Sequence, residues 1–302
     1  MLAPDGLLTC QCRNQGAKSM KPMVKYRGGK SRELHEILPF VPSSFERYIE
    51  PFFGGGALYF RLEAENAIVN DLNRPLMNFY QTVRNNFDQL RTELDELEKL
   101  YKSNRTAFEE AKAATPNERV YDANETLYYQ IRDMYNGIKD SPFLDATLYF
   151  FINKTSYSGM IRHNKKGEFN VPYGRYKNFN TQLVSRAHSK LLQTAQVTNG
   201  DYAEVFDQCT PKDFVFLDPP YDSIFSDYGN AETIDGFSEN SHRRLASDFF
   251  NLPSQALLVI GETDLTKELY GSNVIHTYEK AYAVNIRNRF KARSRHLLVS
   301  NK

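Results

Sequence analysis

Short apolar runs alternate with helical patterns along most of the chain. Residues 48–52 are typical of a strand that ends in a glycine-rich loop, residues 57–65 have helical character, and residues 67–71 indicate a second strand that ends in an acid. A strand, a tight turn, a helix and another strand make a βαβ unit, which places its strands parallel in one sheet. The pattern therefore predicts an α/β domain built on a parallel sheet.

The middle third of the chain has a different, helical pattern. Four apolar residues recur on one helical face with charged residues elsewhere, namely Leu90, Leu94, Leu97 and Tyr101. Further helices are expected over about residues 124–136 and 144–151, and no convincing strand occurs between about residues 77 and 151. This segment is therefore expected to be a helical insertion.

Strand-like patterns resume after the helical segment and continue to the end of the sequence. They cover residues 195–198, 213–217, 256–260, 274–278 and 296–300. We therefore expect a catalytic α/β domain made of residues 20–83 and 190–302, divided by an insertion over residues 84–189. Residues 1–19 lack periodicity and are expected to form a flexible leader.

Composition narrows the class of protein. Of the 302 residues 41% are hydrophobic and 13% aromatic, which allows a packed core and excludes wholesale disorder. The three cysteines, Cys10, Cys12 and Cys209, cannot build a disulfide framework, and the first two lack a second Cys/His pair that would complete a metal site. No apolar run reaches the roughly 18 residues that cross a bilayer. The expectation is a soluble cytoplasmic protein with no membrane partner and no metal.

Charge is unevenly placed although the formal net charge is only +1. Residues 13–32 carry seven bases and no acid, residues 154–190 carry eight bases and one acid, and residues 280–295 carry six bases and no acid. Residues 46–145 instead carry 18 acids and 12 bases. If the three basic stretches converge on one face, that face would bind the phosphates of a nucleic acid. The alternative is three separate solvated surfaces.

The most informative tetrapeptide is Asp218-Pro219-Pro220-Tyr221, directly after the apolar residues 214–217. Ligands of open α/β sheets bind at the carboxyl ends of strands. Two prolines fix the backbone and remove two N–H donors, which leaves the Asp218 carboxylate and the Pro219 carbonyl as acceptors beside the Tyr221 ring. This set suits an exocyclic amine on a planar base, with the ring stacked on the tyrosine. The alternative is a stiff turn that only ends a strand.

A glycine-rich loop supplies a second candidate site. Phe53, Gly54 and Gly56 lie between a predicted strand and a predicted helix, where a ligand can approach the backbone closely. Asp71, at the end of the next strand, is placed to accept hydrogen bonds from ribose hydroxyls. The glycine spacing does not fit a dinucleotide fingerprint, and Val24 stands where a P-loop would need glycine.

These motifs together resemble those of the Dam-like DNA adenine-N6 methyltransferases, in the order of the α group. Residues 25–30 (Lys-Tyr-Arg-Gly-Gly-Lys) are similar to the N-terminal cofactor motif of that family, and residues 50–56 to its S-adenosylmethionine loop. Residues 218–221 are similar to its catalytic tetrapeptide, and residues 153–176 to its DNA-reading segment. The resemblance extends from about residue 21 to the C-terminus. It implies a Rossmann-like methyltransferase sheet with a helical target-recognition insertion.

The resemblance also implies the residues that bind S-adenosylmethionine. Tyr26, Lys30, Asp71 and Asp218 would contact the cofactor, Asp71 through the ribose. Asp201 stands where the family often places residues of the adenine pocket, but it is equally suited to cap the helix that follows it.

Residues that match base-contacting positions of the family form the implied DNA-binding set: Lys25, Tyr157, Ser158, Met160, Arg162, Pro172 and Tyr176. The planar fork of Arg162 can grip guanine O6 and N7, or a phosphate, and Tyr157 can wedge into the base stack where an adenine leaves it. Tyr157 and Met160 would otherwise pack in a core.

The function implied is transfer of a methyl group from S-adenosylmethionine to N6 of a flipped adenine in double-stranded DNA. GATC is the favoured target, although Ser158 replaces an asparagine of Dam, and Tyr26 and Arg27 replace its Trp-Ala. The alternatives are an inactive DNA-binding relic or a methyltransferase that acts on cytosine N4 or on RNA adenine. A restriction endonuclease of the same system is a possible partner.

Overall fold

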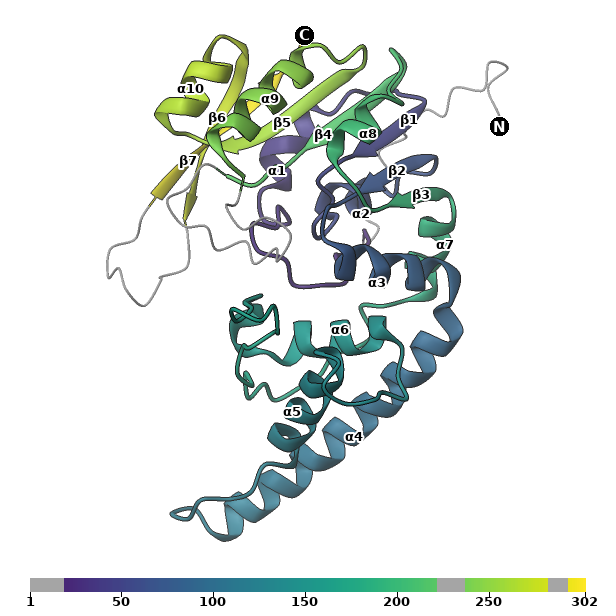
Figure 1. Ribbon diagram of the computed structural model, residues 1–302, viewed down its shortest axis with the longest axis vertical. Coiled ribbons are helices and arrows are strands. Elements are labelled where there is room, and N and C mark those ends of the chain that lie inside the picture. The colour runs from purple at the N-terminus through teal and green to yellow at the C-terminus, as the bar shows by residue number, and fades with distance from the viewer. Residues whose placement is uncertain (1–18, 222–236, 282–292) are drawn as a thin grey trace. The chain divides into compact units, whose positions relative to one another are not determined.

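The structure is a computed structural model that describes residues 19–221, 237–281 and 293–302 (Figure 1). The chain divides into two compact units: residues 1–20, 30–72 and 194–302 form the first, and residues 21–29 and 73–193 form the second. The units thus divide at residues 72/73 and 193/194, whereas the sequence analysis divided the domains at 83/84 and 189/190. Cys10, Cys12 and nearly all of the expected leader lie outside the described residues.

A seven-stranded sheet forms the first unit, in the order β3-β2-β1-β4-β5-β7-β6. Its strands are β1 (Arg47–Glu50), β2 (Ala67–Asn70), β3 (Ala195–Thr198), β4 (Asp213–Leu217), β5 (Gln255–Gly261), β6 (Val274–Ala281) and β7 (Arg293–Ser300). The first five strands pair in parallel, which confirms the predicted α/β sheet. The last strand, β7, lies antiparallel between β5 and β6, a pairing that the sequence analysis did not address.

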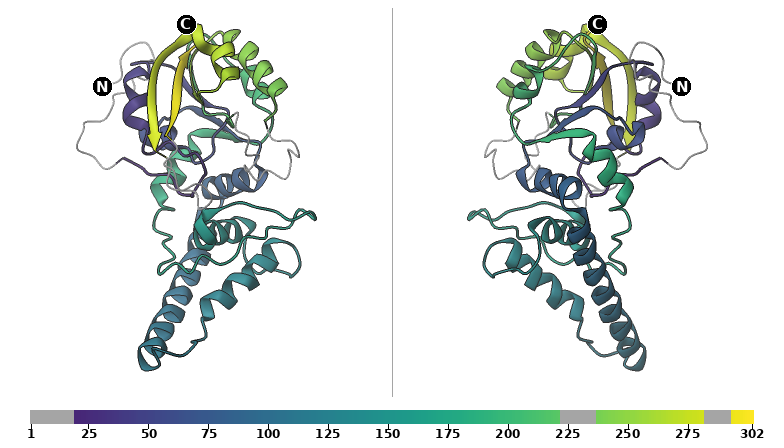
Figure 2. Two further views of the ribbon diagram at one scale, coloured as in Figure 1. Left: turned by 90° about the vertical axis from the view of Figure 1, so that its left-hand side faces the viewer. Right: turned by 90° about the vertical axis from the view of Figure 1, so that its right-hand side faces the viewer.

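Helices cover both faces of this sheet. They are α1 (Leu34–Ile37), α2 (Ala57–Leu62), α8 (Tyr202–Phe206), α9 (Glu239–Phe250) and α10 (Asp264–Tyr270), with short 3₁₀ turns η1 (Leu38–Phe40) and η3 (Gly271–Asn273). Figure 2 shows α1 on the opposite side of the sheet from α9 and α10. Successive side chains of a strand point to opposite faces of the sheet, so a single strand contributes side chains to the core on each face.

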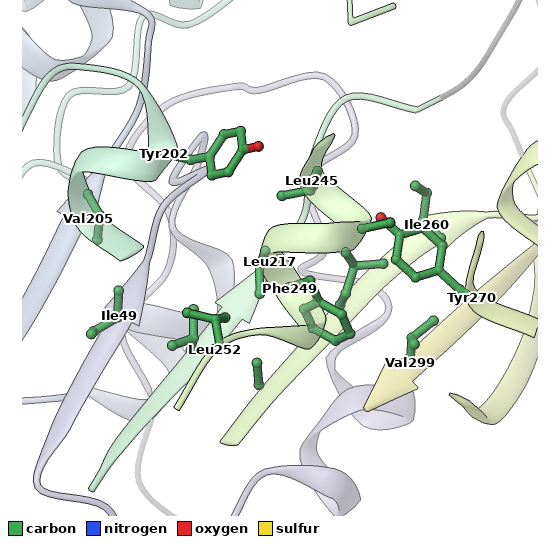
Figure 3. Close-up of a cluster of buried hydrophobic side chains, with 14 of the residues drawn as sticks. Ile49, Tyr202, Val205, Leu217, Leu245, Phe249, Leu252, Ile260, Tyr270 and Val299 are labelled. Carbon is green, nitrogen blue, oxygen red and sulfur yellow. The ribbon is translucent and has the colours of Figure 1, made fainter. Parts of the chain in front are cut away.

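A cluster of buried hydrophobic side chains fills the core between the sheet and α8, α9 and α10 (Figure 3). Ile49 of β1 and Leu217 of β4 meet Tyr202, Leu245 and Phe249 from the helices there. On the other face, Tyr48 packs against Phe214 and against Tyr59 of α2. Because these side chains are buried on both faces of the sheet, β1 and β4 present only their ends to a ligand.

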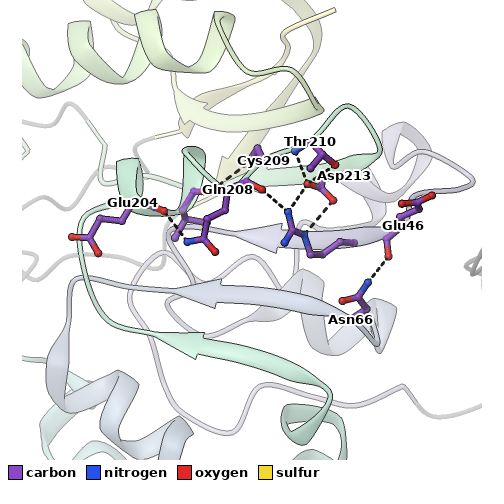
Figure 4. Close-up of polar contacts among 9 residues, drawn as sticks. Glu46, Asn66, Glu204, Gln208, Cys209, Thr210 and Asp213 are labelled. Carbon is purple, nitrogen blue, oxygen red and sulfur yellow. Dashed lines mark hydrogen bonds and ion pairs between the residues drawn. The ribbon is translucent and has the colours of Figure 1, made fainter.

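A buried polar contact fixes the start of β4 against β1. The Arg47 guanidinium pairs with Asp213 at 2.7 Å, and the same carboxylate accepts a hydrogen bond from the backbone N–H of Thr210, also at 2.7 Å (Figure 4). Arg47 also donates to the Gln208 carbonyl. The two central strands are thereby held in register.

The strand order reverses between β1 and β4. From β1 the chain continues to β2 and β3 on one side, whereas β4 and β5 lie on the other side. In open α/β sheets this reversal leaves a crevice at the carboxyl ends of the strands, where ligands bind. The residues that follow β1 and β4 are the glycine-rich loop and Asp218, so the two motifs singled out in the sequence meet at this edge.

The second unit is helical, as the sequence predicts. It contains α3 (Arg74–Asn85), α4 (Phe87–Ala114), α5 (Ala123–Tyr135), α6 (Asp145–Thr155), η2 (Tyr157–Gly159) and α7 (Arg186–Gln193). Helix α6 is buried on nearly all sides and packs against α3, α4 and α5. Its Phe150 stacks on Phe79 of α3, with ring centroids 5.5 Å apart. Since α3 and α7 also pack on each other, they belong to this unit.

The glycine-rich loop leads to a stability prediction. Gly56 has φ +64°, and a Cβ there would lie 2.6 Å from the buried Phe53 ring. We expect Gly56→Ala to lower the free energy of unfolding by about 2–4 kcal/mol, from left-handed backbone strain and a forced shift of that ring. Urea unfolding measures this. Gly271→Ala is the control in the same unit, because Gly271 has helical φ and open space around it, and its effect should stay within about 0.5 kcal/mol.

Candidate active site

A buried ion pair lies at the carboxyl end of β4. The Lys30 side chain is 2% exposed, and its ammonium lies 2.6 Å from each carboxylate oxygen of Asp218. Burial raises the pKa of Asp218, and the positive charge of Lys30 opposes that rise. Because an unpaired ammonium is costly to bury, Lys30 and Asp218 hold each other in place.

The rest of the proline-rich tetrapeptide surrounds this pair. Pro219 is buried, Pro220 and Tyr221 are partly exposed, and the Tyr221 ring centroid lies 4.9 Å from the Lys30 ammonium. On its other side the Tyr221 ring approaches the backbone of β5, where a Cβ at Gly261 would lie 3.3 Å from it. The Asp218 carboxylate and the Tyr221 ring therefore both lie beside the Lys30 ammonium, and the predicted role of the Pro219 carbonyl as an acceptor stays a prediction.

The glycine-rich loop contacts the acid at the end of β2. The backbone N–H of Gly54 donates to Asp71 Oδ2 at 2.8 Å, and the Phe53 N–H donates to the Asn70 carbonyl at 2.8 Å. The Phe53 side chain is buried against Tyr59. Phe53 therefore joins the loop to the core through its ring and to the end of β2 through its backbone N–H.

A third carboxyl group, not assigned to the site from sequence, lies at the end of β1. Glu50 is buried and accepts a hydrogen bond from the Tyr48 hydroxyl at 2.8 Å. Burial raises its pKa well above the usual range, and the negative charges of Asp218 and Asp71 raise it further. Burial and these two charges therefore both favour the neutral form of Glu50.

Asp201 caps a helix. Its carboxylate accepts a hydrogen bond from the Ala203 N–H at 3.0 Å, at the start of α8, and pairs with Arg244 at 3.0 Å. The capping role left open by the sequence is thus present. A role in an adenine pocket stays a prediction.

Behind Tyr221 lies a polar cluster that local sequence patterns do not reveal. Glu33 accepts hydrogen bonds from the Tyr278 hydroxyl at 2.8 Å and from His296 Nδ1 at 2.9 Å, and it pairs with the Lys280 ammonium. Burial would raise the pKa of Glu33, but the His296 hydrogen bond and the charges of Lys30 and Lys280 outweigh it and lower that pKa to about 2. Glu33 and His296 are 263 residues apart in sequence, so no spacing rule joins them.

In the second unit, Asn153 holds the predicted DNA-binding residue Lys25. The Lys25 N–H donates to Asn153 Oδ1 at 2.9 Å, and Asn153 Nδ2 donates back to the Lys25 carbonyl at 2.7 Å. The Lys25 ammonium donates to the Lys154 carbonyl at 3.0 Å and lies 3.8 Å above the Tyr176 ring. Two predicted DNA contacts, Lys25 and Tyr176, are therefore neighbours. Tyr26, the expected cofactor residue, accepts a turn hydrogen bond from Gly29 in this unit.

The loop after α6 exposes its large side chains. Tyr157 is 43% exposed and Met160 39% exposed, so neither is a core residue. Ser158 has φ +55°, the left-handed conformation that an asparagine would also tolerate. Tyr157 and Met160 thus lie on the surface, where a ligand can reach them.

Arg162 lies in a hairpin with residues 169–173. Its Nε donates to Asn170 Oδ1 at 2.8 Å, and the Asn170 N–H donates to the Arg162 carbonyl at 3.0 Å. The guanidinium is exposed. Asn170, on the opposite side of the hairpin, therefore holds the guanidinium in a defined direction at the surface. The carbonyl of the exposed Pro172 accepts a hydrogen bond from the Tyr157 N–H at 2.9 Å.

Helices α4 and α5 hold the backbone of this segment. Tyr101 donates to the Tyr176 carbonyl at 2.6 Å, Tyr128 donates to the Val171 carbonyl at 2.7 Å, and the Asn136 side chain bonds both backbone groups of Phe169. The sequence analysis placed Tyr101 on a core face but did not assign it this polar contact. A segment without regular structure is thereby fixed at several points.

The described part of the chain contains neither a cluster of metal-ligating side chains nor a helix suited to span a membrane. No group of three or more His, Cys, Asp or Glu side chains that could hold a metal ion occurs among these residues. None of their helices combines the length and apolar character needed to cross a bilayer. The basic stretch 280–295 lies mostly outside the described residues.

Comparison with known proteins identifies the family. Residues 26–284 match the model of the D12 class N6 adenine-specific DNA methyltransferases. The chain belongs to this family. It is an adenine-specific DNA methyltransferase, and DNA is its substrate.

Curated relatives span nearly the whole enzyme. It is 31% identical over 290 residues to the type II methyltransferase M.CviBI of Paramecium bursaria Chlorella virus NC1A, covering 93% of this chain and 100% of the relative. It is 33% identical to the type II methyltransferase M.MjaIII of Methanocaldococcus jannaschii, covering 83% and 87%. It is 29% identical to the DNA adenine methylase of Salmonella typhi, covering 86% and 87%.

The lowered pKa of Glu33 gives a pH-dependent stability prediction. A carboxyl whose pKa falls from 4.5 to about 2 on folding stabilises the fold above pH 4.5 by on the order of 3 kcal/mol. We expect Glu33→Gln to lose this stability at pH 7. Below pH 4.5 the difference in the free energy of unfolding between wild type and Glu33→Gln should shrink by about 1.4 kcal/mol per pH unit, because Glu33 of the wild type then binds a proton on unfolding. Urea unfolding between pH 7 and 3.5 measures the difference. A difference that does not change with pH would contradict the charge network around Glu33.

Proposed function

We propose that this methyltransferase uses S-adenosylmethionine to methylate N6 of an adenine that is flipped out of double-stranded DNA. One observation supports the proposal most strongly: Asp218, at the strand end beside the reversal of strand order, is held through both oxygens by buried Lys30. Its neighbours are a proline carbonyl and a tyrosine ring. This is the set of groups that an exocyclic amine on a planar base requires.

The chain offers groups that suit each polar part of the cofactor. The cofactor would lie against the loop of Phe53, Gly54 and Gly56, which follows β1 and allows close approach to the backbone, and the Asp71 carboxylate at the end of β2 suits ribose hydroxyls. Lys30 and Asp218, which pair with each other, are included among the cofactor contacts on the resemblance to Dam-like enzymes. We include Tyr26 and Asp201 on the resemblance to Dam-like enzymes. When bound, S-adenosylmethionine supplies a methyl group already activated by its sulfonium.

The tetrapeptide would act on the adenine by position and charge. The Asp218 carboxylate and the Pro219 carbonyl accept the two N–H bonds of N6, which directs the nitrogen lone pair out of the hydrogen-bonding plane. The Tyr221 ring stacks on the base, and Pro220 keeps the backbone rigid. The closed site replaces water around the amine, and it requires neither a metal nor a covalent nucleophile.

The exposed residues of the second unit would read the DNA. Arg162 is directed by Asn170 and offers a planar donor fork to guanine. Tyr157 would fill the space left by the flipped base. The remaining members of the proposed DNA-binding set are Lys25, Ser158, Met160, Pro172 and Tyr176.

We propose GATC as the target sequence on the resemblance to Dam-like enzymes. Ser158, Tyr26 and Arg27 depart from the residues of Dam itself, and these are the positions where a difference in target sequence would arise. Relatives named as type II methyltransferases support a role beside a restriction endonuclease that cuts the same sequence.

Replacement of Asp218 tests the chemistry. We expect Asp218→Ala to abolish methyl transfer and to leave DNA binding largely intact, because the carboxylate holds the amine rather than the DNA backbone. The chain is expressed in a methylation-free host, and its DNA is sequenced for modified bases. N6-methyladenine in one short motif, lost in the variant, is the expected result and also gives the target sequence.

The same experiment separates the alternatives. Wild-type turnover of Asp218→Ala would refute the assignment of the tetrapeptide. N4-methylcytosine would indicate a different target amine, and methylated RNA a different substrate. A folded chain that binds S-adenosylmethionine but modifies nothing would favour an inactive relic.

Replacement of Arg162 tests sequence reading. We expect Arg162→Ala to lower discrimination at one base pair by about 1–3 kcal/mol, because the bidentate contact to a guanine is lost. Methylation rates on a set of singly substituted duplexes measure this. Lys177→Ala is the control, since Lys177 is exposed and in the same segment. It should weaken binding to all duplexes alike, and unchanged discrimination in Arg162→Ala would exclude base reading by that residue.

A further inference from the structure

We propose that Glu33 and His296 are a positioning pair for the Tyr221 ring, so that the proposed methyl-transfer site includes a strand residue close to the C-terminus. The proposal rests on the function proposed above for Tyr221. It assigns neither residue a contact with the substrate or the cofactor.

His296 is completely buried in the middle of the antiparallel part of the sheet. Its side chain is 0% exposed, and its backbone registers with Gly261 of β5 and Tyr278 of β6. The imidazole ring lies 5.1 Å from the Tyr221 ring, centroid to centroid, at an interplanar angle of 87°. Tyr221 therefore contacts both the His296 ring and the Lys30 ammonium, and Gly261 leaves room for its ring.

Glu33 fixes the orientation of the histidine. Its Oε2 lies 2.9 Å from His296 Nδ1, and a carboxylate can only accept there, so Nδ1 carries the proton. The same oxygen accepts from the Tyr278 hydroxyl at 2.8 Å. The Tyr221 hydroxyl is 3.5 Å from Nδ1, too far for a strong hydrogen bond, so the contact of His296 with Tyr221 is mainly the one between their rings, and it depends on the plane of the imidazole.

One helical turn joins this pair to the ion pair at Asp218. The Glu33 N–H donates to the Lys30 carbonyl at 2.8 Å, so the two residues leave the same turn in different directions. Lys30 reaches Asp218, and Glu33 reaches His296. The carboxylate and the ring of the tetrapeptide are thus both held from one short segment.

Two polar substitutions of His296 test the role. Asparagine places an amide near the position of Nδ1 and can still donate to Glu33, whereas glutamine places its amide near Nε2. Single-turnover methyl transfer is measured at saturating DNA and S-adenosylmethionine, with calorimetric titration of S-adenosylhomocysteine and thermal unfolding for each variant. His276→Gln is the matched control, because His276 forms a similar pair with Glu36 at 2.9 Å but does not contact Tyr221.

We expect His296→Gln to slow transfer by about 10- to 100-fold, the usual cost of a displaced reacting group, with cofactor affinity close to wild type. His296→Asn should recover most of the rate, and His276→Gln should leave it unchanged. Equal rates for His296→Gln and wild type would overturn the proposal, as would equal losses in both His296 variants. If wild type itself transfers no methyl group, the proposed function fails instead, so the two failures are distinguishable.

Discussion

The buried ion pair between Lys30 and Asp218 is the interaction on which the candidate site depends. A lysine that is 2% exposed would be strongly unfavourable without a partner at 2.6 Å. The pair brings the N-terminal motif to the end of β4, 188 residues away in sequence. It also places positive charge beside Tyr221 and, through the turn that follows, brings Glu33 to His296. Loss of the Asp218 charge would remove the carboxylate that contacts the buried Lys30 ammonium through both oxygens.

At the carboxyl ends of the parallel strands, the charge of the carboxyl groups depends on burial as much as on ion pairs and hydrogen bonds. Asp218 is paired with Lys30, Asp71 accepts a backbone N–H, and burial raises the pKa of Glu50. Burial and the negative charges of the two aspartates both favour the neutral form of Glu50, so the three carboxyl groups at the ends of β1, β2 and β4 are accommodated in different ways.

The sequence by itself determined most of the secondary structure and the identity of the central residues. Strands β3 and β4 have the predicted bounds, and the helical insertion and the two motifs at the reversal of strand order follow from periodicity and local spacing. This is possible because hydrophobic alternation, tight turns and acids at strand ends are local features. Helix α9 was not among the predicted helices, although the sequence contained a signal for it. Its buried residues His242, Leu245, Ala246 and Phe249 follow helical spacing.

Only the tertiary structure decided the antiparallel insertion of β7, the packing of α3 and α7 with the second unit, and the contacts that hold the site residues. Glu33 with His296, Tyr101 with the backbone of Tyr176, and Asn153 with Lys25 each join residues far apart in sequence. Such pairs have no fixed spacing, because they depend on which strands and helices become neighbours. The sequence named the groups expected to do the chemistry, and the fold decided what positions them.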